Sequence, residues 1–284
     1  MKAAGTRITF GLLAALLAAP TQGAPIQAPE RIVSMGLCTD QLVMLLADPD
    51  AILSVHWVTQ DSDDSALARQ AARYAANHGL AEEVLQHRPD LVFADATNSP
   101  LAVTMLERQG VRVVTVPVAD TFAGTRANIR QVAAALGVPG KGEALVAAFD
   151  RDLAATRDAL AARHYRALVY GANGFSAGVP SLFDDVLTHL GLINIAGRLG
   201  QSGWVSMSVE DVIRADPELL ILGEYRPEAP SMANMVLEHP ALSSLRHGRP
   251  VVRVPTSLWN CGTPMLAKAA RVLAEQVARA EAGR

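Results

Sequence analysis

The chain has 284 residues, of which 50% are hydrophobic and 19% are charged, and its formal net charge is −3 at pH 7. This composition supplies enough apolar surface for one large or two small domains and excludes a fully disordered chain. Lysine and arginine are scattered, without the basic stripe and interleaved aromatic residues typical of nucleic-acid binding. Only two cysteines occur, Cys38 and Cys261, so the fold is not a disulfide-stapled scaffold and must be held by its core.

The N-terminus predicts a secretory signal peptide over residues 1–23. Lys2 and Arg7 frame the start of an apolar stretch over 8–19, and small residues follow it at Thr21, Gly23 and Ala24. The apolar stretch is short for a membrane span, although an uncleaved anchor helix is the alternative. Cleavage after Gly23 removes two positive charges, which takes the net charge from −3 to −5.

Along the rest of the chain, short runs rich in β-branched residues alternate with helical patterns. Thr39 precedes a predicted helix over 40–47, and Gly110 and Gly137 follow predicted helices over 99–109 and 121–136. This alternation predicts an α/β fold with mainly parallel sheets. The predicted strands cover residues 32–35, 52–55, 91–94, 113–116, 167–170, 219–222 and 251–254.

Residues 141–164 are exceptional because no strand interrupts them and their apolar residues recur at helical spacing. A helix of this length would measure about 33 Å at the usual rise per residue. We interpret it as a rigid spine at 139–165 that joins an N-terminal lobe at 24–138 to a C-terminal lobe at 166–284. The alternative is one long helix inside a single domain.

An internal repeat supports two lobes of similar construction. Each copy predicts a short helix with acidic residues in its first turn, then a proline, then a buried strand. Glu82 pairs with Glu210 and Pro89 with Pro217 at a constant offset of 128 residues. Chance similarity is the alternative, since this unit is common. The two copies read AEEVLQHRPDLVFA at 81–94 and VEDVIRADPELLIL at 209–222.

The order and spacing of these segments resemble the periplasmic substrate-binding proteins of ABC importers for iron-siderophores, haem and vitamin B12. The resemblance covers nearly all of the mature chain. It implies a periplasmic monomer with two Rossmann-like lobes joined by a single long α-helix, a ligand between the lobes, no catalytic residues and no cofactor. The segments that resemble the family are PERIVSMGLCTDQLVMLLADPDAILSVHW, EEVLQHRPDLVFA, SMSVEDVIRADPELLIL and VVRVPTSLWNCGTPMLAKAARVLAEQV.

The resemblance implies that the ligand is a metal chelate (cobalamin, haem or a ferric siderophore) that is delivered to the membrane permease. Trp57, Trp204 and Trp259 all fall in predicted loops, where they could stack on a flat chelate or cover hydrophobic edges of the lobes. The resemblance places them at cleft-lining positions of vitamin B12 binders. Leu258 departs from that pattern, since one such protein has an acid before the last tryptophan. No ring of arginines marks a ferric-catecholate site.

Three further residues are predicted to contact the ligand. Thr39 ends the loop at 34–39, whose backbone N–H groups and following helix N-terminus suit a polar ligand group. Phe175 lies in the glycine-rich loop at 171–178. This loop is either the second-lobe counterpart of the loop at 34–39 or a plain surface connection. His56, beside Trp57, is either a polar cleft contact or a surface histidine. The seven histidines show no metal-binding spacing, so no protein metal site is predicted.

The cysteines also fall in predicted cleft loops, Cys38 in the first lobe and Cys261 in the second. Three alternatives are open: a disulfide, two separately buried thiols, or contact of a thiolate with the ligand or its metal. A permanent bridge would tie the lobes together and hinder release, which argues against a simple structural staple.

Two acids are predicted to dock the protein on its transporter. By the resemblance, one surface acid on each lobe faces arginines of the permease, and these acids map to Glu82 and Glu210. The alternative is that both acids only complement helix dipoles. Glu83 and Asp211 are neighbours that could share the role.

A secreted serine hydrolase is the alternative function. Residues 174–178 read G-F-S-A-G, which formally matches the G-x-S-x-G pattern around a nucleophile, here Ser176. In a hydrolase that serine sits on a tight turn between strand and helix. Here the strand is predicted to end near Tyr170 and the next helix to begin near Pro180, which places Ser176 in mid-loop.

Overall fold

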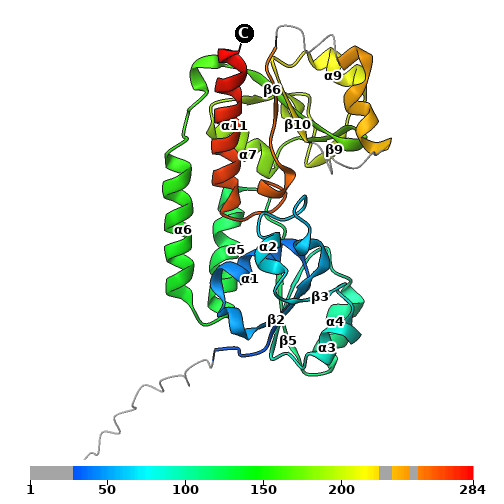
Figure 1. Ribbon diagram of the computed structural model, residues 1–284, viewed down its shortest axis with the longest axis vertical. Coiled ribbons are helices and arrows are strands. Elements are labelled where there is room, and N and C mark those ends of the chain that lie inside the picture. The colour runs from blue at the N-terminus through cyan, green and yellow to red at the C-terminus, as the bar shows by residue number, and fades with distance from the viewer. Residues whose placement is uncertain (1–27, 224–231, 243–248, 284) are drawn as a thin grey trace, which may run out of the picture.

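The computed structural model describes residues 28–223, 232–242 and 249–283. The predicted signal peptide and its cleavage position lie outside the described residues. Two parallel sheets form two lobes, one above the other in Figure 1. Within the described ranges, no helix is long and apolar enough to cross a membrane. The predicted fold class, α/β with two lobes and mainly parallel sheets, is confirmed.

The first lobe contains a sheet of five parallel strands in the order β3-β2-β1-β4-β5. Helices cover both faces of this sheet, which is why its central strands are buried. The strands are β1 (Ile32–Ser34), β2 (Ile52–His56), β3 (Ala75–Asn77), β4 (Leu91–Asp95) and β5 (Arg112–Val116). The helices are α1 (Leu37–Leu46), α2 (Ala68–Ala71), α3 (Ala81–Gln86), α4 (Pro100–Arg108) and α5 (Phe122–Ala135).

The second lobe contains a parallel sheet in the order β11-β10-β6-β8 and a separate antiparallel pair, β7-β9. Its strands are β6 (Arg166–Gly171), β7 (Phe175–Ala177), β8 (Ile193–Asn194), β9 (Trp204–Ser206), β10 (Leu219–Gly223) and β11 (Val251–Arg253). Its helices are α7 (Leu182–His189), α8 (Ile195–Arg198), α9 (Val209–Ala215) and α11 (Met265–Ala282). Short 3-10 turns cover Pro49–Ala51, Trp57–Gln60, Ala161–Arg163, Ala172–Gly174, Met232–Glu238 and Thr256–Leu258.

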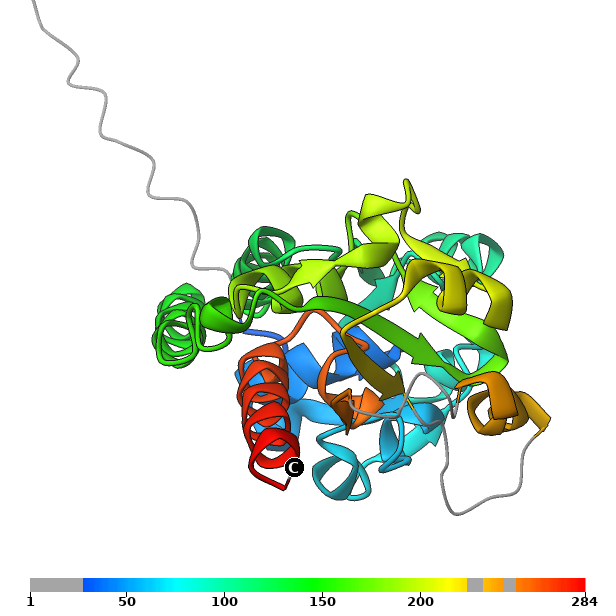
Figure 2. The same ribbon diagram turned by 90° about the horizontal axis from the view of Figure 1, so that it is seen from above.

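Helix α6 (Pro139–Ala154) joins the two lobes. Val146 packs in the first-lobe core, whereas Phe149 and Leu153 pack in the core of the second lobe. One helix therefore contributes to two cores, which fixes the lobes to a common rigid element. Figures 1 and 2 show α6 and α11 along the same side of the molecule.

Helix α6 is shorter than the sequence predicts, ending at Ala154 rather than near His164. Beyond it, Asp158 and His164 adopt left-handed backbone conformations, with φ of 54° and 52°. The N–H groups of Asp158 and Leu160 donate to carbonyls at the end of α7, both at 2.9 Å. Tertiary hydrogen bonds thus replace the helical ones, and the helical spacing of Leu160 reflects its burial in the second-lobe core.

Candidate functional site

A cavity of about 770 Å³ lies between the lobes, within the usual range of about 300–1,000 Å³ for small-molecule sites. Its first-lobe wall is formed by the segments that follow the parallel strands, where ligands of open α/β sheets bind. These segments are 35–39 after β1, 78–80 after β3, 95–99 at the end of β4 and 116–120 at the end of β5. The second part of the chain contributes Leu182, Phe183, Trp204, Trp259, Asn260 and Gly262.

The lining is mainly apolar, with a few polar groups and a weakly acidic character. Asp95 and Asp120 are its carboxylates, and among the described residues no lysine or arginine lines the cavity. Asp95 accepts hydrogen bonds from the backbone N–H of Thr97 at 2.9 Å and from its hydroxyl. An extended anionic ligand would find no cation among these lining residues.

Five of the residues predicted to bind ligand line this cavity: Cys38, Thr39, His56, Trp204 and Trp259. Among these residues Trp204 offers an accessible aromatic ring to a ligand, because 63% of the residue is exposed. Trp259 is only 1% exposed, and its ring packs on Phe183 with centroids 4.6 Å apart. Burial in the second-lobe core therefore leaves Trp259 little surface for stacking.

The other three predicted residues do not line the cavity. The Trp57 ring is 45% exposed and packs against His56 and His78, with ring centroids 6.1 and 6.0 Å away. Phe175 supports Trp204 edge to face at 5.3 Å, and Cys261 is buried. The three tryptophans thus do not converge on one stacking surface.

His78 is a cavity residue that the sequence analysis missed, because β3 is short and its Ala-Ala-Asn sequence is no strand signal. The sequence Asn77-His78-Gly79, which is typical of a turn, was the available signal that a strand ends at this place. Asn77 is buried, and its side-chain amide donates to the Ser34 carbonyl (2.9 Å) and the Ser54 hydroxyl (2.8 Å). Gly79 has φ of +74°, a conformation that favours glycine.

His78 is also paired with a carboxylate. The backbone N–H of His78 donates to Glu83 Oε2 at 2.6 Å, and its Nδ1 lies 3.0 Å from Oε1. These hydrogen bonds lower the pKa of Glu83 below its ordinary value. Asp211 is engaged as well, in a capping box with Ser208 and an ion pair with Arg214 at 2.8 Å. The neighbours of Glu82 and Glu210 are therefore committed to local contacts.

Asp40, on α1 next to the cavity loop, is fully buried. Its Oδ2 accepts from the backbone N–H of His56 (2.7 Å) and from the hydroxyl of Thr59 (2.5 Å), while Oδ1 has no hydrogen-bond partner. Burial raises the pKa of Asp40 to about 7, although hydrogen bonds to the carboxylate oppose the increase. Burial likewise lowers the pKa of His56, which favours its neutral form.

The raised pKa of Asp40 predicts a pH-dependent effect of Asp40→Asn. Between the ordinary pKa of 3.8 and about 7 the folded state retains a proton that the unfolded state releases, so this group's contribution to stability falls as pH rises. The Asn variant lacks this dependence. The difference in free energy of unfolding, Asp40→Asn minus wild type, should be roughly 2–4 kcal/mol more favourable to the variant at pH 8 than at pH 4, as measured by urea denaturation. Asp50→Asn, at an exposed position, is the control. An equal pH-dependent change of stability in both variants would contradict the raised pKa of Asp40.

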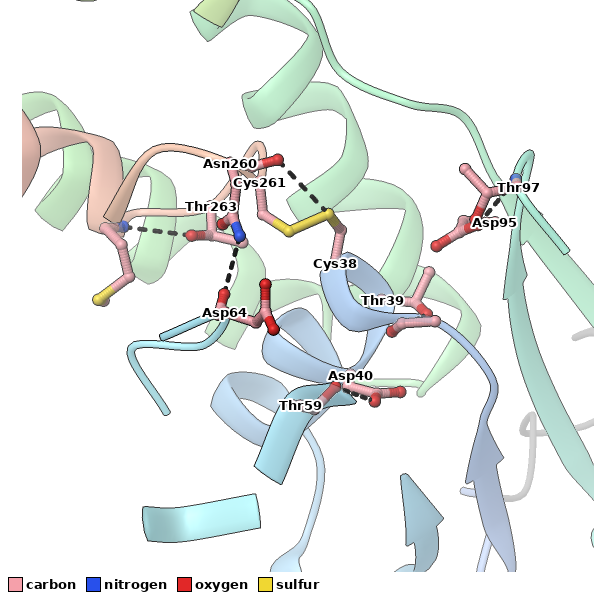
Figure 3. The surroundings of a disulfide bond; sticks show 12 residues. Cys38, Thr39, Asp40, Thr59, Asp64, Asp95, Thr97, Asn260, Cys261 and Thr263 are labelled. Carbon is pink, nitrogen blue, oxygen red and sulfur yellow. Dashed lines mark hydrogen bonds between the residues drawn. A yellow bond between two sulfur atoms is a disulfide. The ribbon is translucent and has the colours of Figure 1, made fainter. Parts of the chain in front are cut away.

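Cys38 and Cys261 form a disulfide with their Cα atoms 5.2 Å apart (Figure 3). Neither sulfur is therefore a free thiolate, so the alternatives of two buried thiols and of a metal-bound thiolate are wrong. The bridge fastens the loop before α11 to the first turn of α1. In the same loop the side-chain amide of Asn260 donates to the Asp64 carbonyl at 2.8 Å. This loop thus packs on the first lobe, although its sequence neighbours belong to the second.

Ser176 lies in strand β7, so the prediction of a mid-loop position is wrong. It is fully buried, and its hydroxyl donates to the Val169 carbonyl at 2.8 Å. A nucleophile must be accessible and hydrogen-bonded to a base, whereas this hydroxyl is occupied by a backbone acceptor. The arrangement gives no support to the serine hydrolase.

Comparison with known proteins agrees with this architecture. The sequence profile of a family described as "Periplasmic binding protein" matches residues 32–249. The periplasmic haem-binding protein of Roseiflexus sp. RS-1 superposes with a TM-score of 0.74 at 24% identity, covering 88% of this chain and 98% of that one. A periplasmic haem-binding protein of Pseudomonas aeruginosa gives 0.70 at 24% identity, covering 88% and 92%.

A periplasmic vitamin B12-binding protein of Vibrio cholerae has the same fold, with a TM-score of 0.67 at 18% identity and coverage of 89% of this chain and 98% of that one. At these identities the structural likeness establishes the fold alone. No curated protein matches the chain.

Proposed function

Since the chain belongs to the periplasmic binding protein family, whose members are solute-binding proteins, we propose that it captures a metal chelate and delivers it to the permease of an ABC importer. The candidate chelates are cobalamin, haem and a ferric siderophore. We further propose that residues 1–23 are a signal peptide that directs the protein to the periplasm, where it acts as a monomer.

The cavity is the observation that supports this proposal most strongly. Its volume of about 770 Å³ and its largely apolar wall suit a ligand with a broad apolar face. Trp204 offers an exposed ring from the second lobe. His56 and His78, in the first-lobe wall, offer imidazole nitrogens as polar contacts for a ligand. Because no described lining residue is a lysine or arginine, cobalamin or haem fits this lining better than a strongly anionic ferric catecholate.

We propose that Glu82 on α3 and Glu210 on α9 make the contact with the permease. Both are exposed residues in the first turns of short helices, one on each lobe. Glu83 and Asp211, which could have shared the role, are held by His78 and by Ser208 with Arg214. The exposed glutamates thus remain available to basic groups of a partner.

Replacing Trp204 by alanine should weaken chelate binding by about 1–3 kcal/mol, because the variant loses stacking and buried area. Trp57→Ala should have a smaller effect, since Trp57 does not line the cavity. Calorimetric titration of both variants with haem, aquocobalamin and a panel of ferric siderophores measures the difference. The chelate assignment is wrong if wild type binds none of these ligands, and the site is wrong if Trp204→Ala binds like wild type.

A further inference from the structure

We infer that the Cys38–Cys261 bond is a site of thiol–disulfide exchange that is reached through the cavity, and that its redox state sets the affinity for the cargo (Figure 3). The oxidised protein has the high-affinity cavity, the reduced protein has a weakened one, and a bound chelate shields the bond from reduction. The identity of the cargo rests on the proposed function, and the reductant is a dithiol.

The two sulfurs of the bond differ in their accessibility. Cys38, in the first turn of α1, is half-buried and lines the cavity, whereas Cys261 is 2% exposed and is not a lining residue. A thiolate therefore attacks the sulfur of Cys38, and it does so from the cavity. A chelate that fills the cavity covers this route, so the loaded protein should be reduced more slowly than the empty one.

The exchange proceeds in two balanced steps. A thiolate of the dithiol forms a bond with the Cys38 sulfur, the Cys38–Cys261 bond breaks, and its electron pair leaves on the Cys261 sulfur, which takes up a proton. The second thiol of the reductant, as its thiolate, then displaces the Cys38 sulfur, which is protonated in turn. The protein gains two electrons and two protons, and the reductant leaves as a disulfide.

The segment that carries Cys261 forms part of the cavity wall, and we call residues 259–262 the strap. At its start the ring of Trp259 packs on Phe183 of the second lobe, with the centroids 4.6 Å apart. A shift of the strap changes the wall that a ligand contacts, because all its residues except the cysteine line the cavity: Trp259, Asn260 and Gly262.

Contacts with the first lobe leave the strap no room to move closer to it. The side-chain amide of Asn260 donates to the Asp64 carbonyl at 2.8 Å. Gly262 packs so tightly that a Cβ atom there would lie 2.5 Å from the Cβ of Ala119. Sulfurs joined by a bond are about 2 Å apart, whereas non-bonded heavy atoms need roughly 3.5–4 Å. Because α1 is anchored in the first-lobe core, breaking the bond moves the strap away from α1.

Buried amides beside the bond favour this movement. Gln41 is fully buried one turn after Cys38, on the same side of α1. Among the described residues, its Nε2 and Oε1 have no hydrogen-bond partner, and neither has Oδ1 of Asn260. Buried polar groups without a partner are costly, and a strap that moves away from α1 admits water to them. The bond thus holds closed an interface that these groups oppose.

The first test compares the affinity of three forms: oxidised wild type, wild type reduced with dithiothreitol and then freed of it under nitrogen, and the Cys38→Ser, Cys261→Ser variant. The probes are cyanocobalamin, gallium(III) protoporphyrin IX and gallium(III) siderophores, chosen because the protein's thiols do not reduce their metals. The reduced protein and the double variant should bind about 10-fold more weakly than oxidised wild type. Equal affinity of the oxidised and reduced forms would overturn the inference and leave the proposed function intact.

Leu106→Ala separates this effect from a loss of stability. Leu106 is fully buried in the first lobe and does not line the cavity, so its truncation destabilises the fold without touching the strap. Circular dichroism verifies that each form is folded at the temperature of the titration. Leu106→Ala should bind as tightly as oxidised wild type, and an equal loss of affinity in this variant would overturn the inference.

The second test uses wild type alone and measures whether the cargo protects the bond. The protein is equilibrated with mixtures of reduced and oxidised dithiothreitol, with and without saturating probe, and its free thiols are counted by mass after alkylation. Binding and reduction are reciprocal, so the probe should lower the equilibrium constant for reduction by the same factor, about 10-fold, by which reduction lowers the affinity.

A reduction equilibrium that saturating probe leaves unchanged would overturn the inference, whatever the variants do. Failure of every probe and every ferric siderophore to bind oxidised wild type would overturn the proposed function and this inference together. Binding by the oxidised form distinguishes the two cases.

Discussion

Replacing both Cys38 and Cys261 by serine should lower the free energy of unfolding by about 3–5 kcal/mol. The bond joins residues 223 positions apart, and a cross-link across so long a loop strongly restricts the unfolded chain. Cys261 is also buried in a loop that packs on both lobes, through Trp259 on Phe183 and through Asn260 on the Asp64 carbonyl. Urea denaturation of the oxidised wild type and the double variant measures the loss.

The reduced wild-type protein provides the matched comparison, because it breaks the same bond without changing the sequence. It should unfold at nearly the urea concentration of the double variant. If wild type and variant unfold together under oxidising conditions, the bridge does not stabilise this protein. Weaker chelate binding by the double variant should accompany the loss of stability, since Cys38, Trp259 and Asn260 line the cavity.

The double variant Glu82→Arg, Glu210→Arg should abolish chelate uptake by cells while leaving chelate binding unchanged. The two glutamates are exposed on equivalent helices of the two lobes, and charge reversal turns attraction to basic permease groups into repulsion. Uptake of a labelled chelate by cells that rely on this protein measures the effect. Binding by the purified protein is measured beside it.

The control reverses two exposed glutamates that lie elsewhere on the lobes, Glu107 on α4 and Glu238 in the turn at Met232–Glu238. The Glu107→Arg, Glu238→Arg variant changes the net charge equally and should transport normally. Normal uptake by the Glu82→Arg, Glu210→Arg protein would contradict the docking assignment. Loss of uptake in both variants would show that net charge matters and not the docking positions.

The sequence predicts the fold well because buried parallel strands have a strong local signature. The runs at β4 and β10 are almost wholly apolar, and the repeat around them marks equivalent places in the two sheets. The sequence predicts a longer α6 because Leu160 continues its apolar spacing. In the structure Leu160 lies beyond the helix, where its side chain is buried in the second-lobe core and its backbone N–H donates to a carbonyl at the end of α7. Only tertiary structure supplies those acceptors.

The site was predicted less completely than the fold. The strand pattern indicates which segments lie at the cavity, so Cys38, Thr39, His56 and Trp204 were placed correctly beside it. The prediction that they lie in loops is wrong, because Cys38 and Thr39 are in the first turn of α1, His56 ends β2 and Trp204 begins β9. The direction of a side chain in a loop depends on its tertiary contacts instead. Trp57 therefore lies outside the lining, although it packs on the lining residues His56 and His78, while Trp259 is largely buried against Phe183.

Two further features depend on contacts between distant segments. His78 follows a strand that only its pairing with β2 reveals. The Cys38–Cys261 bond joins residues from opposite ends of the chain, so the sequence left disulfide, free thiols and ligand contact open. In each case the local sequence is compatible with several environments, and the packing of the whole chain selects one.

Native mass spectrometry of the protein purified from its own periplasm tests the central claim most directly. We expect a population with one metal chelate bound per chain, whose mass, metal content and absorption spectrum identify it, and a smaller chelate-bound population in Trp204→Ala. A protein that is free of chelate when purified from chelate-rich cells, and that takes up neither haem, nor cobalamin, nor any ferric siderophore on addition, would contradict it.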